Sequence, residues 1–168
     1  GARRALELLG IKPAMYISIE NDSSCVLVVR NAWPEVITFE NVEDMEELVL
    51  KDLLGAVPSL VSGIILGGAP CQGFTGLSRQ RRGFEDPRSG GIAMFAQLVV
   101  KLRKAAPHIE WHSMLENVAS MSDSDRSAIT QILEPVYATE EIPRKPYQID
   151  AAIMSSVRRP RYYWLSRR

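Results

Sequence analysis

The sequence has few of the features that mark a disulfide-rich, metal-binding or membrane protein. Its 168 residues contain two cysteines and two histidines, and Cys25 and Cys71 lack the spacing of a disulfide framework or a metal-ligand set. Apolar runs are too short to cross a bilayer, and no signal-peptide pattern is found. Formal net charge is zero, so an overall basic signature of nucleic-acid binding is missing. What remains is one globular domain with a sizeable core, in a compartment that the scarcity of cysteine suggests is reducing.

The stretch 67–74, Gly-Gly-Ala-Pro-Cys-Gln-Gly-Phe, is the point around which the sequence is organised. The apolar run 61–66 before it ends in two glycines, which indicates a buried strand that stops at a sheet edge. Open α/β sheets bind ligands just beyond the carboxyl ends of their strands. Cys71, on a rigid Pro-Cys turn at that edge, is therefore placed as a nucleophile would be. A free cysteine after a strand is more often a small buried hydrophobe, so position alone leaves both interpretations open.

The other elements alternate between helix and strand, which is typical of a parallel α/β fold. Helices are predicted over 2–9, 22–33, 44–54, 92–105 and 124–133, and strands over 15–20, 36–38, 61–66, 111–116, 147–152 and 161–165. The last two strands are expected to form a hairpin-like pair at one edge. Cys25 lies on the apolar part of the second helix and is expected in the core. The polar stretch 73–91 has five glycines and four arginines, which suits a binding loop.

Candidate site residues follow several of these strands. Glu20 ends the first strand, where an acid in a dinucleotide-type fold accepts hydrogen bonds from ribose hydroxyls, although a strand-end glutamate is more often only solvated. Glu116 ends another strand in the same way. Arg159 and Arg161 alternate along a strand and therefore share a face. For Glu116 and the two arginines, surface ion pairs are the alternative explanation.

Together, these residues resemble the cytosine-5 methyltransferase family. The nucleophile motif is Pro70–Gln72, the acid motif is Glu116–Val118 and the arginine motif is Arg159–Arg161, in the family's order. Residues 83–88 are similar to the end of the family's catalytic loop. Each motif alone is weak evidence, but the ordered set is specific. Residues 149–164 are most similar to the de novo DNA methyltransferases of animals, whereas the form of 70–74 is more similar to bacterial and maintenance enzymes.

The resemblance implies an S-adenosylmethionine-dependent methyltransferase fold, a Rossmann-like α/β sheet with helices on both faces. S-adenosyl-L-methionine would be the cofactor. The expected contacts of the cofactor are Glu20 at the ribose, Asn41 and Val42 at the adenine, Pro70, and Met94 in the adenine pocket. For Met94, packing in the core is an equally good explanation. The family's Phe-x-Gly-x-Gly turn, the strand before it, the target-recognition region and the final helix are not found. Residues 1–168 are therefore expected to be a partial catalytic domain, poorly folded and nearly inactive by itself.

The implied chemistry starts with the Cys71 thiolate, which would add to carbon 6 of cytosine and make carbon 5 nucleophilic. Glu116 would bind ring nitrogen 3 and the exocyclic amine and donate a proton. Arg159 and Arg161 would hold the cytosine oxygen and a nearby backbone or carboxylate group. The base must be flipped out of the duplex, and the loop must close over it. Nucleic-acid contacts are expected from Gln72, Arg79, Arg81, Arg82 and Arg88.

Two alternatives stay open beside a DNA cytosine-5 methyltransferase. One is methylation of cytosine in transfer RNA by the same machinery, and the other is a non-catalytic homologue that binds a partner or nucleic acid. Because Cys71 and Glu116 are both present, an active parent enzyme is favoured. The expected partner is a cytosine-containing DNA duplex, with RNA less favoured and neither a metal nor a membrane involved. The expected location is the nucleus in a eukaryote or the cytoplasm in a bacterium.

Overall fold

The computed structural model describes residues 2–70, 90–137 and 145–166. All the predicted helices and strands are present, with ends shifted by a few residues. The first half contains α1 (Ala2–Leu8), β1 (Ile17–Ile19), α2 (Ser23–Ala32), β2 (Ile37–Phe39), the short 3-10 helix η1 (Val42–Asp44) and α3 (Glu47–Gly55). The second half contains β3 (Ser62–Gly68), α4 (Gly91–Ala105), β4 (Glu110–Val118), α5 (Asp123–Ile132), η4 (Glu134–Val136), β5 (Tyr147–Asp150), η5 (Ala151–Ile153) and β6 (Pro160–Leu165).

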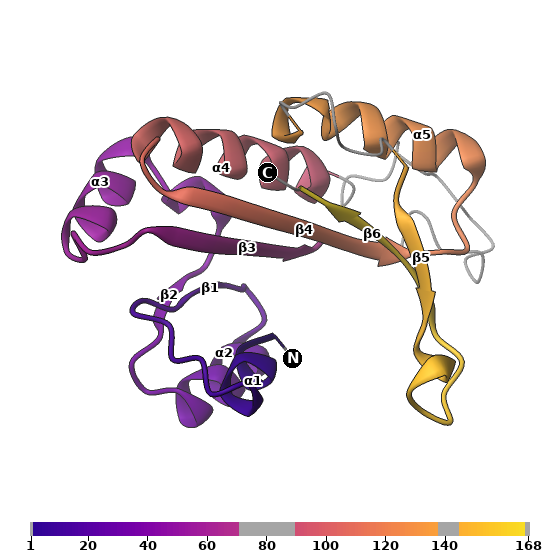
Figure 1. The fold of residues 1–168 in the computed structure, drawn as a ribbon, viewed down its shortest axis with the longest axis horizontal. Helices are drawn as coiled ribbons and strands as arrows, with labels where there is room; N and C mark the ends of the chain where they lie inside the picture. Colours follow the sequence, from indigo (N-terminus) through magenta and orange to yellow (C-terminus); the bar gives the residue numbers. More distant parts are fainter. Residues whose placement is uncertain (1, 71–89, 138–144, 167–168) are drawn as a thin grey trace.

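The described strands form two sheets (Figure 1). β1 and β2 make a parallel pair, and a four-stranded mixed sheet has the order β3-β4-β6-β5. β3 is parallel to β4, whereas β6 is antiparallel to both β4 and β5, so the predicted hairpin-like pair is confirmed at one edge. Helices α4 and α5 lie above the larger sheet, α3 lies beside its left end, and α1 and α2 lie below the smaller sheet (Figure 1). Helices on both sides of the strands fit the predicted α/β methyltransferase-type fold.

Two groups of buried side chains hold these layers together. One joins α4 and α5 to β4 and β6 through Phe95, Leu115, Ile129 and Trp164, among others. The other joins α3, α4 and β4, and half-buried side chains of β1 and β2 pack against it. The two-stranded sheet is therefore attached to the rest of the fold by apolar packing rather than by strand hydrogen bonds. Within the described ranges, no helix is long and apolar enough to cross a membrane.

Cys25 is a correction to the sequence analysis, which expected it in the core. Its side chain is exposed, because the inward face of α2 is made by Val26 and Val29, with Trp33 just beyond the helix end. Helix α2 is apolar around most of its circumference, so the pattern alone does not show which face packs. Leu27 and Val28 are likewise exposed, at 61% and 67%.

Strand β3 also differs from its predicted burial. Its residues alternate between exposed and half-buried, with Ile64 58% and Leu66 45% exposed. The reason is that β3 is the edge strand of the larger sheet, and α4 covers only one of its faces. On that covered face, Gly63 and Gly67 allow close approach: a Cβ atom would lie 2.3 Å from Trp111 at Gly63 and 2.5 Å from Phe95 at Gly67.

The connection between β5 and β6 is held by Asp150. Its Oδ1 atom accepts hydrogen bonds from the backbone N–H of Ala152 at 3.1 Å and of Arg159 at 2.7 Å, and so ties the two ends of the connection together. Its Oδ2 atom lies 3.6 Å from Nε of Arg158. The two backbone donors, followed by the charge of Arg158, lower the pKa of Asp150.

Replacing Gly67 with alanine should destabilise the fold, because the new methyl group would displace the buried ring of Phe95. We expect a loss of about 1–3 kcal/mol in the free energy of unfolding, measured by urea denaturation. Gly68→Ala is the matched control, since its Cβ would meet Glu116 Oε2 at an ordinary 3.7 Å. Neither glycine has a positive φ. Equal losses in the two variants would contradict this account of α4 packing.

The hydrogen bonds that Asp150 accepts from Ala152 and Arg159, which we call the Asp150 clamp, predict a pH-dependent contribution to the free energy of unfolding. A carboxyl whose pKa is lower in the folded state stabilises it above the unfolded pKa, and that contribution is lost as pH falls through the folded pKa. Wild type should therefore be more stable than Asp150→Asn at neutral pH, and the gap should narrow below about pH 4. Urea midpoints at several pH values measure this, with Glu40→Gln, at an exposed glutamate, as a carboxylate control. A gap independent of pH would show that the charge of Asp150 is not involved.

Candidate active site

The carboxyl ends of β3 and β4 meet at one edge of the larger sheet. The two strands are parallel, and Gly68 is the register partner of Glu116. Ala69 and Pro70 continue from β3 at this edge, so the residue that follows them, Cys71, is connected directly to it. Cys71 itself lies outside the described residues. The register places Glu116 beside the end of β3, and the predicted shared site of Cys71 and Glu116 stays a prediction.

Glu116 is paired with Arg161 across the sheet. Nε of Arg161 lies 2.7 Å from Oε1 of Glu116, and the two side chains are 20% and 29% exposed. Arg161 is opposite Val118 on the neighbouring antiparallel strand, and Glu116 is opposite Tyr163, so the pair is diagonal on one face. Nη1 of Arg161 also donates to the carbonyl of Pro160 at 2.9 Å. The arginine thus orients the carboxylate at the sheet edge.

Arg159 is placed differently from Arg161. Its backbone N–H is bound to Asp150, and it is exposed at the start of the strand. Among the described contacts, Glu116 is joined to Arg161 and not to Arg159. The proposed shared role of the two arginines at one cytosine therefore stays a prediction, with Arg161 the better placed.

Asn117 is a positioning residue that the predicted site did not include, although it is the middle residue of the acid motif. It is 1% exposed, its Oδ1 accepts from the backbone N–H of Val118 at 2.8 Å, and its Nδ2 donates to the carbonyl of Ala69 at 3.4 Å. This amide links the end of β4 to the backbone two residues before Cys71. A buried amide costs free energy unless it is hydrogen-bonded, so both contacts fix its orientation.

The smaller sheet brings the predicted cofactor residues to its own carboxyl edge. Glu20 follows β1 and its backbone N–H donates to the carbonyl of Phe39 at the end of β2. Asn41 follows shortly after β2. Oε1 of Glu20 accepts from the backbone N–H of Asp22 at 3.0 Å, which orients the carboxylate. The backbone N–H of Asn41 donates to Asp44 at 2.9 Å and fixes the start of η1.

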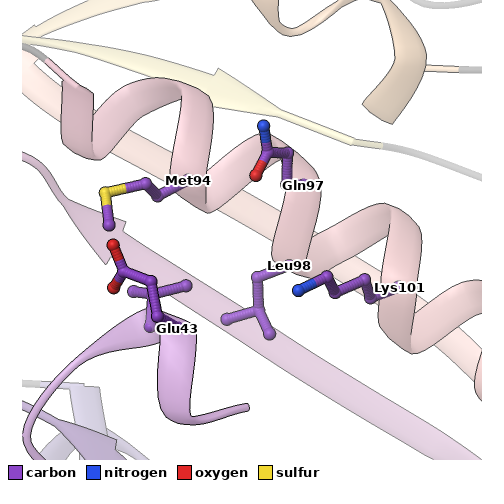
Figure 2. Close-up of a pocket in the computed structure, with 6 residues that line it drawn as sticks. Glu43, Met94, Gln97, Leu98 and Lys101 are labelled. Carbon is purple, nitrogen blue, oxygen red and sulfur yellow. The ribbon is translucent and has the colours of Figure 1, made fainter. Parts of the chain in front are cut away.

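Val42 and Met94, both predicted at the adenine, line the same hollow between η1 and α4. Figure 2 shows Met94 and Glu43 pointing toward each other across it, with Leu98 at its floor and Lys101 farther along α4. The hollow is small, about 70 Å³, and open to solvent on one side, and its lining is completed by Gln97. Apolar side chains (Val42, Met94, Leu98) and polar ones (Glu43, Gln97, Lys101) contribute equally to its lining.

The remaining predicted residues lie outside the described part of the chain. These are Cys71, Gln72, Arg79, Arg81, Arg82 and Arg88. The described residues on either side of this segment are close together, since a Cβ atom on Gly91 would lie 3.3 Å from Cδ of Pro70. Pro70 and Gly91 therefore lie together just beyond the end of β3, where Gly68 is the register partner of Glu116. In the parts that are described, no group of three or more His, Cys, Asp or Glu residues could hold a metal.

Comparison with known proteins bears on the fold and on the family of the chain. The fold is similar to a crystal structure described as a DNA modification methyltransferase encoded within a prophage of E. coli, with a TM-score of 0.65 and 21% sequence identity. The match covers 89% of this chain and 39% of that one, so the chain spans well under half of its length. The family model of the C-5 cytosine-specific DNA methylases matches residues 1–141. The chain belongs to the C-5 cytosine-specific DNA methylase family.

Proposed function

We propose that this chain carries the catalytic residues of a DNA cytosine-5 methyltransferase, which transfers a methyl group from S-adenosyl-L-methionine to carbon 5 of cytosine. The observation that carries the proposal is the Glu116–Arg161 pair, held at the sheet edge from which the Pro70–Cys71 segment continues. Membership of the methylase family supports the reaction type. We also propose that the enzyme belongs to the de novo branch of the family, because residues 149–164 resemble the de novo DNA methyltransferases of animals.

In this proposal Cys71 attacks carbon 6 of the flipped cytosine, which converts carbon 5 into a nucleophile. Glu116, oriented by Arg161, binds ring nitrogen 3 and the exocyclic amine and supplies a proton as the thiolate adds. The Arg161 guanidinium has five N–H donors, so it can hold Glu116 and still donate to the cytosine oxygen. After the methyl group has been transferred to carbon 5, solvent removes the carbon 5 proton, and the electrons of that C–H bond restore the carbon 5–carbon 6 double bond and expel the Cys71 thiolate. The proton on ring nitrogen 3 returns to Glu116.

In this proposal the adenine of the cofactor packs at the hollow lined by Val42 and Met94. Apolar surface from Val42, Met94 and Leu98 can pack against the faces of a planar ring, and Glu20 at the neighbouring strand end can accept hydrogen bonds from ribose hydroxyls. The cofactor supplies an electrophilic methyl group when bound. Pro70 and the Gly91 end of α4 lie together at the edge between this hollow and Glu116.

Cys71→Ser should abolish covalent capture of a DNA duplex that contains 5-fluorocytosine, because fluorine blocks release of the adduct and serine is too weak a nucleophile. Glu116→Gln should slow capture by about 10²–10⁴-fold. The protein that carries this chain would be incubated with S-adenosyl-L-methionine and labelled duplex, and capture would be measured on a denaturing gel. Cys25→Ser is the matched control, since Cys25 is the other cysteine and lies exposed on α2.

Capture that persists in Cys71→Ser, or is lost in Cys25→Ser, would remove Cys71 from the nucleophile role. Capture of 5-fluorocytosine transfer RNA in place of DNA would favour the RNA alternative. Binding of nucleic acid with no capture by the wild type would favour the non-catalytic alternative.

A further inference from the structure

The connection between β5 and β6, residues 151–159, exposes an unusual amount of apolar surface. We call it the tip, because it projects away from the larger sheet (Figure 1). Within five residues it exposes Ile153 at 77%, Met154 at 86% and Val157 at 60%. Single exposed apolar side chains are common on protein surfaces, but a cluster on a projecting turn indicates a contact with a partner.

The tip is held in one conformation by its own hydrogen bonds. Oγ of Ser155 donates to the carbonyl of Ala151 at 3.0 Å and accepts from the backbone N–H of Val157 at 3.3 Å. The backbone N–H of Met154 donates to Ala151 at 2.9 Å, and Asp150 clamps both ends. Several backbone polar groups are thus hydrogen-bonded within the turn, while Ile153, Met154 and Val157 are exposed. Preorganisation of this kind lowers the entropic cost of binding.

The tip is also locally basic in a chain of zero net charge. Residues 150–159 contain Arg158 and Arg159 against one acid, Asp150, which gives a local charge of +1 without Arg161, the partner of Glu116. The side chain of Arg158 is 88% exposed. Apolar side chains beside exposed arginines complement a partner that combines an anionic surface with an apolar interior. Duplex DNA has phosphates outside and stacked bases inside, and DNA-bending proteins insert Ile and Met between base steps.

The position of the tip connects it to the candidate active site. β4 and β5 are both antiparallel to β6, so their carboxyl ends lie at the same edge of the sheet. The tip begins at the end of β5 and returns through Pro160 to Arg161, which holds Glu116. A duplex whose base reaches Glu116 would therefore pass near the tip.

We propose that the tip is a preformed DNA contact, in which Arg158 binds a phosphate and Ile153 and Met154 enter the groove beside the target base. The proposal rests on the proposed function, because it takes the duplex as the substrate of the Glu116–Arg161 site. It differs from that function in assigning a binding role to residues that take no part in methyl transfer.

The test compares duplex binding by fluorescence anisotropy across several salt concentrations. Ile153→Ser/Met154→Ser should weaken binding about tenfold or more without changing the salt dependence, because apolar contacts release no counterions. Arg158→Gln should weaken binding and reduce the slope of log K against log salt by about one. Leu8→Ser/Leu9→Ser is the matched control, since these side chains, at the end of α1 and just after it, are 76% and 73% exposed away from the tip.

A photo-crosslinking amino acid at position 154 should attach to the duplex, while the same group at position 8 should not; this readout does not depend on the stability of the serine variants. Tip variants that bind DNA as the Leu8/Leu9 control does, with no crosslink from position 154, would overturn the proposal and leave a protein partner as the explanation. A wild type that binds no duplex would also overturn it. The tip variants should still capture DNA that contains 5-fluorocytosine when the DNA is at saturating concentration. If the wild type itself captured no such DNA, the proposed function would be contradicted rather than the role of the tip.

Discussion

The pairing of β6 with β4 is the constraint on which the candidate site depends. Side chains alternate along β6, so Tyr162 and Trp164 enter the core while Arg161 and Tyr163 face the other way. The core face is fixed further by α5, since Arg126 donates to the Tyr162 hydroxyl at 3.0 Å and the Trp164 indole donates to Thr130 at 3.0 Å. A slip of one residue would bury Arg161 and expose both aromatic rings. Apolar packing on one face thus places the ion pair with Glu116 on the other.

Buried contacts also fix the end of β3 relative to β4. Gly67 lets Phe95 approach the strand, and Asn117 connects β4 to the carbonyl of Ala69. These contacts fix the backbone just before Pro70 relative to Glu116. A covalent mechanism needs its nucleophile and its acid at fixed positions relative to each other, because misplacement by about 1 Å lowers the rate on the order of 10²-fold. Buried groups that never touch a substrate therefore decide how well the exposed groups can act.

Much of the fold could be predicted from the sequence, and the exceptions have physical causes. Gly67-Gly68 and the periodicity of 92–105 predicted the strand and helix beside the site because turn residues and helical spacing are local signals. The exposure of Cys25 and of one face of β3 depends on which neighbours cover them, which a local pattern does not contain. Asn117 belongs to the acid motif, but its hydrogen bond to Ala69 forms only when two strands that are distant in the sequence pair. The diagonal ion pair between Glu116 and Arg161 likewise depends on the antiparallel register of β4 and β6.

The zero net charge of the chain conceals a separation of charge that bears on nucleic-acid binding. Residues 40–52 contain six acids and one lysine, whereas residues 150–161 contain three arginines and one acid. Helix α3, which carries part of the acidic segment, and the tip lie at opposite ends of the molecule (Figure 1). Exposed charges farther apart than about 10 Å are largely screened at physiological salt, so a duplex at the tip would respond to the nearby arginines rather than to the total. Zero net charge is therefore compatible with a polyanionic substrate at the edge where Glu116 and Arg161 meet.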